Sequence, residues 1–262
     1  MIHLLLFLIC LFASTVGAIV GAGGGVIIKP VVDALDLLPA SSVSFLSSCT
    51  VLCMTASSLL RGLKDNCRIR YSTTTPLAVG AAMGGFLGNL LFSLVRSAGD
   101  ESILKLVQAI GLTFITALVL LYICLKDRLR SYHVESMPVC LLSGILLGVI
   151  SSFFGIGGGT SNVALLFLLF SMEAKEAARN SIYIILLSQI VNLSSFLLRG
   201  NVPAFEWPSL ILMAAGGVGG ALLGAAISRR MNSKGVTLAL KVLCAAMVLV
   251  NLINAVRVAM NL

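Results

Sequence analysis

Charged residues are so sparse in this chain that long stretches contain none. The 18 basic and 10 acidic residues among 262 leave uncharged runs at 1–28, 37–60, 71–95, 106–125, 136–172, 180–198 and 207–228. Each run reaches the length of about 18 residues that a membrane-crossing helix needs. Only 11% of the residues are charged, against about 25% in ordinary soluble domains, so little chain is left for an aqueous domain. The sequence therefore predicts an all-α, multi-pass integral membrane protein and excludes a conventional soluble enzyme.

The cysteines, histidines and net charge give no sign of a metal, a cofactor or a nucleic acid. Six of the seven cysteines lie in apolar runs, and only Cys67 lies in a charged loop. The two histidines, His3 and His133, stand far apart, so we expect neither a metal site nor a cofactor. The net charge of +8 comes from Lys and Arg at the ends of apolar runs, where the positive-inside rule places them. We therefore expect the lipid bilayer as surroundings and no nucleic-acid partner.

The chain contains an internal duplication. Gly21-Ala22-Gly23-Gly24-Gly25 recurs 134 residues later as Gly155-Ile156-Gly157-Gly158-Gly159. Three further landmarks recur in the same order: Leu60-Arg61-Gly62 as Leu198-Arg199-Gly200, Pro76 as Pro208, and Gly84-Gly85-x-x-Gly88 as Gly216-Gly217-x-x-Gly220. The order predicts two transmembrane repeats, at 1–128 and 136–262. The first 25 residues resemble a signal peptide, but their counterpart in mid-chain favours reading them as mature structure.

The stretch 136–172 indicates how each repeat crosses the membrane. As one helix its 37 residues would be about 55 Å long, nearly twice the hydrocarbon core of about 30 Å. The glycine cluster divides it into arms of 136–154 and 160–172, and the second arm is too short to span. We therefore predict that each repeat is a Gly-broken re-entrant helical hairpin followed by three transmembrane helices. An odd number of full crossings makes the two repeats inverted.

The distribution of basic residues favours this inverted arrangement. It leaves only Arg96, Lys105, Arg199 and Arg257 on one side of the membrane. The other side, expected to be cytoplasmic, receives twelve: Arg61, Lys64, Arg68, Arg70, Lys126, Arg128, Arg130, Lys175, Arg179, Arg229, Arg230 and Lys234. Eight full crossings would give about nine to seven instead. Both termini are then expected on the external side. The protein itself is expected in the cell membrane.

The repeated GxGGG, each time opening a short helix and followed by Arg-Gly, Pro and a Gly-rich helix, resembles the TauE/SafE family of membrane permeases. The resemblance extends over both halves and includes Gly23-Gly24-Gly25 with Pro30 and the Arg199-Gly200-Asn201 signature. The family's Gly-Thr-Ser is matched loosely, by Arg179-Asn180-Ser181 and by the Ser-rich 41–48. Two positions depart from the pattern: Ala164 replaces a proline, and Lys29 replaces an apolar residue. The resemblance implies export of sulfite, sulfoacetate or related organosulfur anions.

The two glycine clusters are the candidate substrate site. A helix that begins inside the membrane presents unpaired N–H groups and a partial positive charge, which suit an anion. Three consecutive glycines interrupt a helix, whereas the i, i+4 glycines at 84–88 and 216–220 suit helix packing. The candidate substrate-binding residues are Gly23, Gly24, Gly25, Lys29, Gly157, Gly158, Gly159, Thr160, Ser161, Asn162, Arg179, Asn180, Ser181, Gln189 and Asn192.

Two alternatives stay open at this point for the polar residues outside the clusters. Lys29 and Asp33 stand i, i+4, so they either attract the anion and carry a coupled proton or neutralise each other. Gln189 and Asn192 either line the pathway or bond neighbouring helices.

Taken together, these features predict a proton-coupled secondary transporter that exports small organosulfur anions by alternating access around a midplane site. An anion channel, or a carrier of non-sulfur organic anions, is the alternative. The chain lacks HExxH and GxSxG and has scattered carboxylates, so we expect no enzyme. The expected partners are the anionic substrate and the bilayer, and a homodimer is compatible with the sequence.

Overall fold

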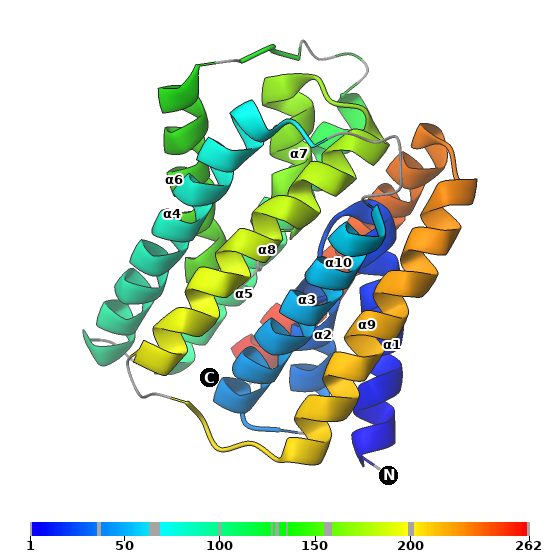
Figure 1. Cartoon of the computed structure of the whole chain (residues 1–262). Coiled ribbons are helices and arrows are strands. Elements are labelled where there is room, and N and C mark those ends of the chain that lie inside the picture. The colour runs from blue at the N-terminus through cyan, green and yellow to red at the C-terminus, as the bar shows by residue number, and fades with distance from the viewer. Residues whose placement is uncertain are drawn as a thin grey trace.

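The computed structural model describes residues 2–35, 38–62, 69–98, 101–126, 128, 131–134, 136–154, 159–198 and 202–260. The regular secondary structure of these residues is α-helical, with short turns and loops between the helices (Figure 1). The helices are α1 (Ile2–Val20), α2 (Gly25–Ala34), α3 (Ala40–Gly62), α4 (Tyr71–Ala98), α5 (Glu101–Leu125), α6 (Met137–Phe154), α7 (Gly159–Phe170), α8 (Ala174–Leu198), α9 (Trp207–Arg230) and α10 (Ser233–Met260). Among the described residues, eight helices are long and apolar enough to cross a membrane, which confirms the all-α integral membrane class.

Each half begins with a long helix that breaks into a short one. In the first half α1 has 19 residues and α2 only 10, and in the second half α6 has 18 and α7 only 12. At 1.5 Å per residue α2 and α7 are about 15 and 18 Å long, too short to span the hydrocarbon core. The predicted arms 136–154 and 160–172 thus coincide closely with α6 and α7. Three span-length helices follow each short helix, as predicted.

Glycine-lined contacts hold two pairs of helices together. On α9, a Cβ added to Gly216 would meet Phe7 and Cys10 of α1, and one added to Gly224 would meet Thr15 and Ala18. On α4, Gly84 and Gly88 lie in the same way against the backbone of α6 at Ile145 and Val149. Within each pair the residue numbers rise together, so the two helices run parallel. These contacts confirm that the glycines at 84–88 and 216–220 serve helix packing.

The pairs α1–α9 and α4–α6 lie on either side of a junction formed by α3 and α8. Asn192 near the end of α8 bonds Ser48 of α3, whereas Gly62 at the end of α3 lies against Arg179 near the start of α8, so α3 and α8 run antiparallel. Counterpart helices of the two halves run in opposite directions in Figure 1, with α3 rising and α8 descending. The repeat relation itself, and its boundaries at 1–128 and 136–262, stay predictions.

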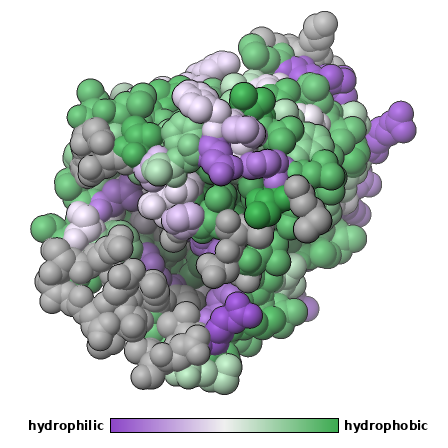
Figure 2. All heavy atoms as spheres, turned by 90° about the horizontal axis from the view of Figure 1, so that it is seen from below, coloured by the Kyte–Doolittle hydropathy of each residue, from purple (hydrophilic) through white to green (hydrophobic). Residues whose placement is uncertain are grey.

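Polar contacts gather at the two ends of the bundle. At one end, here called the basic end, an Nη2 of Arg229 donates to the carbonyl of Arg61 at 3.4 Å, and Arg70 pairs with Glu176 at 2.5 Å. At the opposite end Nε2 of His3 pairs with Glu206 at 3.5 Å. Figure 2 views that opposite end, where hydrophilic residues lie within the face and along its upper right edge, among apolar residues. Apolar side chains cover most of the flanks, as a bilayer requires.

Candidate substrate site

The first helix break owes its shape to glycine. Gly21 has a φ of +76° and Gly23 a φ of +66°, which is the left-handed region that side chains disfavour. The N–H of Ala22 donates to the carbonyl of Gly17 at 3.1 Å, so Gly21 ends α1 in a Schellman-type turn. Gly24 then stands at the N-cap of α2 and supplies no side chain to cap it. The first-turn N–H groups of α2 are therefore not satisfied by a capping side chain.

The first helix break meets the start of α7, the short helix of the second half, inside the protein. A Cβ added to Gly159, the first residue of α7, would overlap the carbonyl oxygen of Ala22 in the first break. The Ser181 hydroxyl on α8 donates to the carbonyl of Gly21 at 2.6 Å and lies 3.5 Å from the carbonyl of Gly159. Gly23 and Gly25 approach Val51, and Gly23 also approaches Ile185. Because Val51 and Ile185 stand midway along α3 and α8, the meeting point lies near the centre of the bundle.

Buried polar atoms surround this meeting point without partners. Thr160, Ser161 and Asn162 form the first turn of α7 and are at most 9% exposed. In the part of the chain that the structure describes, the Ser161 hydroxyl, the Asn162 Oδ1 and the Ser14 hydroxyl are buried and have no hydrogen-bond partner. Ser14 lies on α1 beside Gly24. Unpaired buried polar atoms are costly, so a polar ligand or water here would satisfy them.

The side chains of Arg179, Asn180 and Ser181, which follow one another on α8, contact different parts of the protein. Asn180 is fully buried, and its Oδ1 accepts from the backbone N–H of Arg70 at 3.0 Å and from the Thr74 hydroxyl at 2.7 Å. It therefore joins the start of α4 to α8 and is occupied by protein partners. Arg179 lies against Gly62 at the end of α3. The Ser181 hydroxyl reaches the carbonyl oxygens of Gly21 and Gly159.

The other predicted site residues lie at varying distances from the breaks. Asn192 donates a hydrogen bond to Ser48 at 3.2 Å and accepts one from Asn89 at 3.4 Å. It therefore bonds neighbouring helices, which is one of the two roles that the sequence left open. Gln189, three residues away, has a buried Oε1 without a partner among the described residues. Gly157 and Gly158 lie outside the described residues, as do Arg199, Gly200 and Asn201.

Lys29 and Asp33 lie on α2, downstream of the first break. Lys29 is half-buried one turn after Gly25, and Asp33 is exposed near the end of the helix. Within the described residues no ion pair shorter than 4.0 Å joins them, but the charge of Lys29 still acts on the Asp33 carboxylate, so both interpretations stay open. Their contact with a substrate stays a prediction.

Sequence reasoning missed two residues at the first break. Ser14 is a polar residue in the apolar run of α1, one turn before Gly17, and that position was a usable signal. Met54 accepts the N–H of Gly24 through its sulfur at 3.3 Å. Nothing in the sequence around Met54 distinguishes it from an ordinary core methionine.

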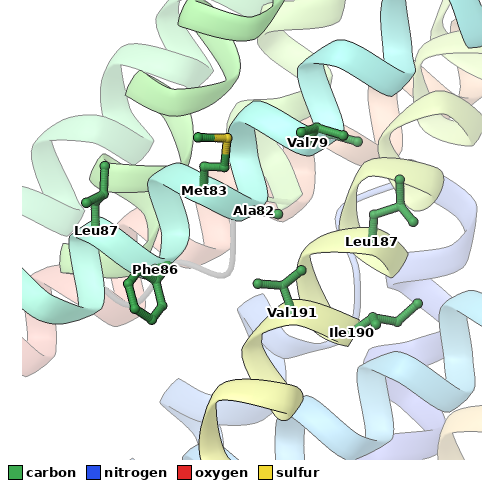
Figure 3. A pocket seen from close by; sticks show the side chains of 9 residues that line it. Val79, Ala82, Met83, Phe86, Leu87, Leu187, Ile190 and Val191 are labelled. Carbon is green, nitrogen blue, oxygen red and sulfur yellow. The ribbon is translucent and has the colours of Figure 1, made fainter. Parts of the chain in front are cut away.

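A groove of about 500 Å³ between α4 and α8 is not this site. Figure 3 shows it lined by side chains such as Val79, Met83, Phe86 and Val191, all of which are apolar. Such a surface offers no donor to an anion. The polar meeting point of the two breaks is therefore the stronger candidate for a charged substrate.

Comparison with known proteins agrees with this architecture. The model of the family described as sulfite exporter TauE/SafE matches residues 6–251. The probable membrane transporter protein YunE of Bacillus subtilis (strain 168) is 25% identical over 263 residues, which cover 92% of this chain and 94% of that protein. A probable membrane transporter protein of Haemophilus influenzae is 26% identical over 200 residues, or 74% of this chain and 72% of its own length. No solved structure gives a significant match. With eight apolar spans among its described residues and a family match over nearly its whole length, this chain belongs to the sulfite exporter TauE/SafE family of membrane transporters.

Proposed function

We propose that this membrane transporter exports small organosulfur anions, such as sulfite or sulfonates, from the cytoplasm. The substrate binds where the two helix breaks meet. The observation that carries the proposal is the contact of Ala22 with Gly159, bridged by Ser181 and surrounded by buried polar atoms without partners. The family's description as sulfite exporters supports the chemical class.

The chemistry of the meeting point suits an oxyanion. Two helix N-termini, at Gly25 and Gly159, bring partial positive charge and backbone N–H groups to one place. The hydroxyls of Ser14 and Ser161 add neutral donors, whereas the free Oδ1 of Asn162 accepts a hydrogen bond, as from a water molecule or a protonated oxygen of the substrate. Lys29, half-buried one turn into α2, adds a positive charge that attracts the anion. Neutral donors with one cation allow binding that is reversible, as transport demands.

Alternating access is the proposed mechanism. The supporting observation is that α1, α3 and α9 run one way and α4, α6 and α8 the other, as inverted repeats require. In this mechanism the group of helices with α1, α3 and α9 tilts against the group with α4, α6 and α8, so that the site is exposed to one side at a time. Asp33, exposed on α2, is the proposed proton carrier. A channel of similar shape is the competing function, because channels also use half-helix dipoles.

Flux in proteoliposomes tests this function. We expect purified protein to accumulate sulfite against its gradient when a pH gradient is imposed, with saturation at high sulfite concentration. Asp33→Asn should still bind sulfite but lose the dependence on the pH gradient. Downhill flux without saturation would instead identify a channel, and faster transport of simple carboxylates than of sulfite or sulfonates would identify the non-sulfur carrier.

A serine pair tests the placement of the site. Ser161→Ala should raise the KM for the anion by about five- to tenfold, because a neutral donor is lost from the site. Ser188→Ala is the matched control, since its hydroxyl donates to the carbonyl of Ile184 in its own helix at 2.9 Å. Initial rates of anion transport in proteoliposomes, measured at several anion concentrations, give the KM of each variant. Equal KM values for the two variants would place the substrate elsewhere.

A further inference from the structure

A second groove lies at the basic end, between α3 and α9. Its volume is about 590 Å³, and it is lined by Ser57, Leu60 and Arg61 of α3 and by Val218, Leu222 and Arg229 of α9. The two arginines stand in the last turns of their helices. They lie close together, because an Nη2 of Arg229 donates to the carbonyl oxygen of Arg61 at 3.4 Å. The side chains of Arg61 and Arg229 therefore both lie at the entrance of this groove.

The apolar lining begins at Leu60, beside Arg61 in the last turn of α3, and continues to Leu222 and Val218, which lie about 10 and 16 Å further along α9 from Arg229. Leu60 is 70% exposed and Leu222 is 38% exposed, and both belong to segments that can cross the membrane. In a bilayer these side chains face hydrocarbon. The groove thus joins a cationic end, at the depth of lipid headgroups, to an apolar wall at the depth of acyl chains.

The groove of Figure 3 offers an internal comparison. It lies between α4 and α8, the counterparts of α9 and α3 in the predicted repeats, and all of its lining residues are apolar. Helix ends and the positive-inside rule account for basic residues in general, but they do not require two arginines to converge on one apolar groove. Of these two described grooves, only the one between α3 and α9 combines charge with apolar surface.

We infer that the groove between α3 and α9 binds an anionic phospholipid of the leaflet at the basic end. Arg61 and Arg229 hold the headgroup phosphate, because a guanidinium donates two parallel bonds to phosphate oxygens. The Ser57 hydroxyl lines the groove beside them, and one acyl chain lies along Leu60, Val218 and Leu222. Basic pockets between transmembrane helices are a recurring site for anionic headgroups. This site is separate from the substrate site and does not depend on the proposed function.

Lipid titration of the purified full chain tests the inference. In mild detergent, phosphatidylglycerol should raise the Tm more than phosphatidylcholine with the same acyl chains, because a ligand of the folded state stabilises it. The double variant Arg61→Gln with Arg229→Gln should lose that difference. Native mass spectrometry should show retained phosphatidylglycerol, with affinity about fivefold weaker for each arginine removed.

Arg230→Gln is the matched control, because Arg230 is an exposed neighbour at the same helix end and does not line the groove. It should keep the response to phosphatidylglycerol. Glycerol phosphate without acyl chains should give no stabilisation. The inference is overturned if phosphatidylglycerol and phosphatidylcholine act alike, if the double variant responds like the parent, if Arg230→Gln loses the response equally, or if glycerol phosphate alone reproduces it.

Discussion

Replacing Gly159 by alanine is expected to abolish transport. The added Cβ would overlap the carbonyl oxygen of Ala22, and backbone atoms on both sides cannot move as a flexible side chain would. The two helix breaks would have to separate, which would also stretch the bonds that Ser181 makes to them. Overpacking of this kind costs about 1–3 kcal/mol or more. Transport should therefore fall to background even where folded protein remains.

The control for this prediction is Gly219→Ala on α9. A Cβ at Gly219 would meet only the end of the Leu11 side chain, at 3.1 Å, which can rotate away. Sulfite flux, protein amount in the membrane and elution in gel filtration should be measured for both variants. Normal flux by Gly159→Ala would show that the close approach of the two breaks is not needed for function.

Replacing Asn180 by leucine is expected to give the largest loss of stability. Leucine has a similar volume but leaves the Arg70 N–H and the Thr74 hydroxyl without their acceptor at a fully buried position. The fully buried Thr74 hydroxyl would cost about 1–3 kcal/mol and the part-buried Arg70 N–H less, so the variant should lose about 1–4 kcal/mol. The start of α4 would detach from α8 first. A large fall in Tm in detergent, without ligand, would show this loss.

Asn162→Leu is the variant to compare with Asn180→Leu, in both Tm and anion transport. Asn162 is equally deep, but its Oδ1 has no partner among the described residues, so an apolar replacement removes no bond made by that oxygen. We expect it to keep the Tm and to lose anion transport, the reverse of Asn180→Leu. If both variants lost stability to the same extent, Asn162 would be a structural residue as well.

Much of the architecture follows from local properties of the sequence. The spans are visible because 28 charges interrupt an apolar chain, and the breaks are visible because glycine triplets cannot continue a helix stably. The site was harder to predict, because it depends on packing. Asn180 and Ser181 are neighbours in sequence but point about 100° apart on a helix, so one bonds α4 and the other the breaks. The role of Ser14 likewise depends on which face of α1 meets α2. A polar residue in an apolar run marks Ser14 as unusual but does not fix that face.

The close backbone contact along the glycine-lined pairs has a mechanical consequence. Helices that touch through Gly216 and Gly220, or through Gly84 and Gly88, have little freedom to slide, so α9 carries α1 with it and α4 carries α6. The described helices then include two rigid groups, one with α1, α3 and α9 and the other with α4, α6 and α8. The boundary between the two groups runs between α3 and α8. Gly21 belongs to the first group and Ser181 to the second, so the 2.6 Å hydrogen bond between them crosses the boundary that the proposed alternating access would open. Tilting of the two groups against each other would break this hydrogen bond without unwinding any helix.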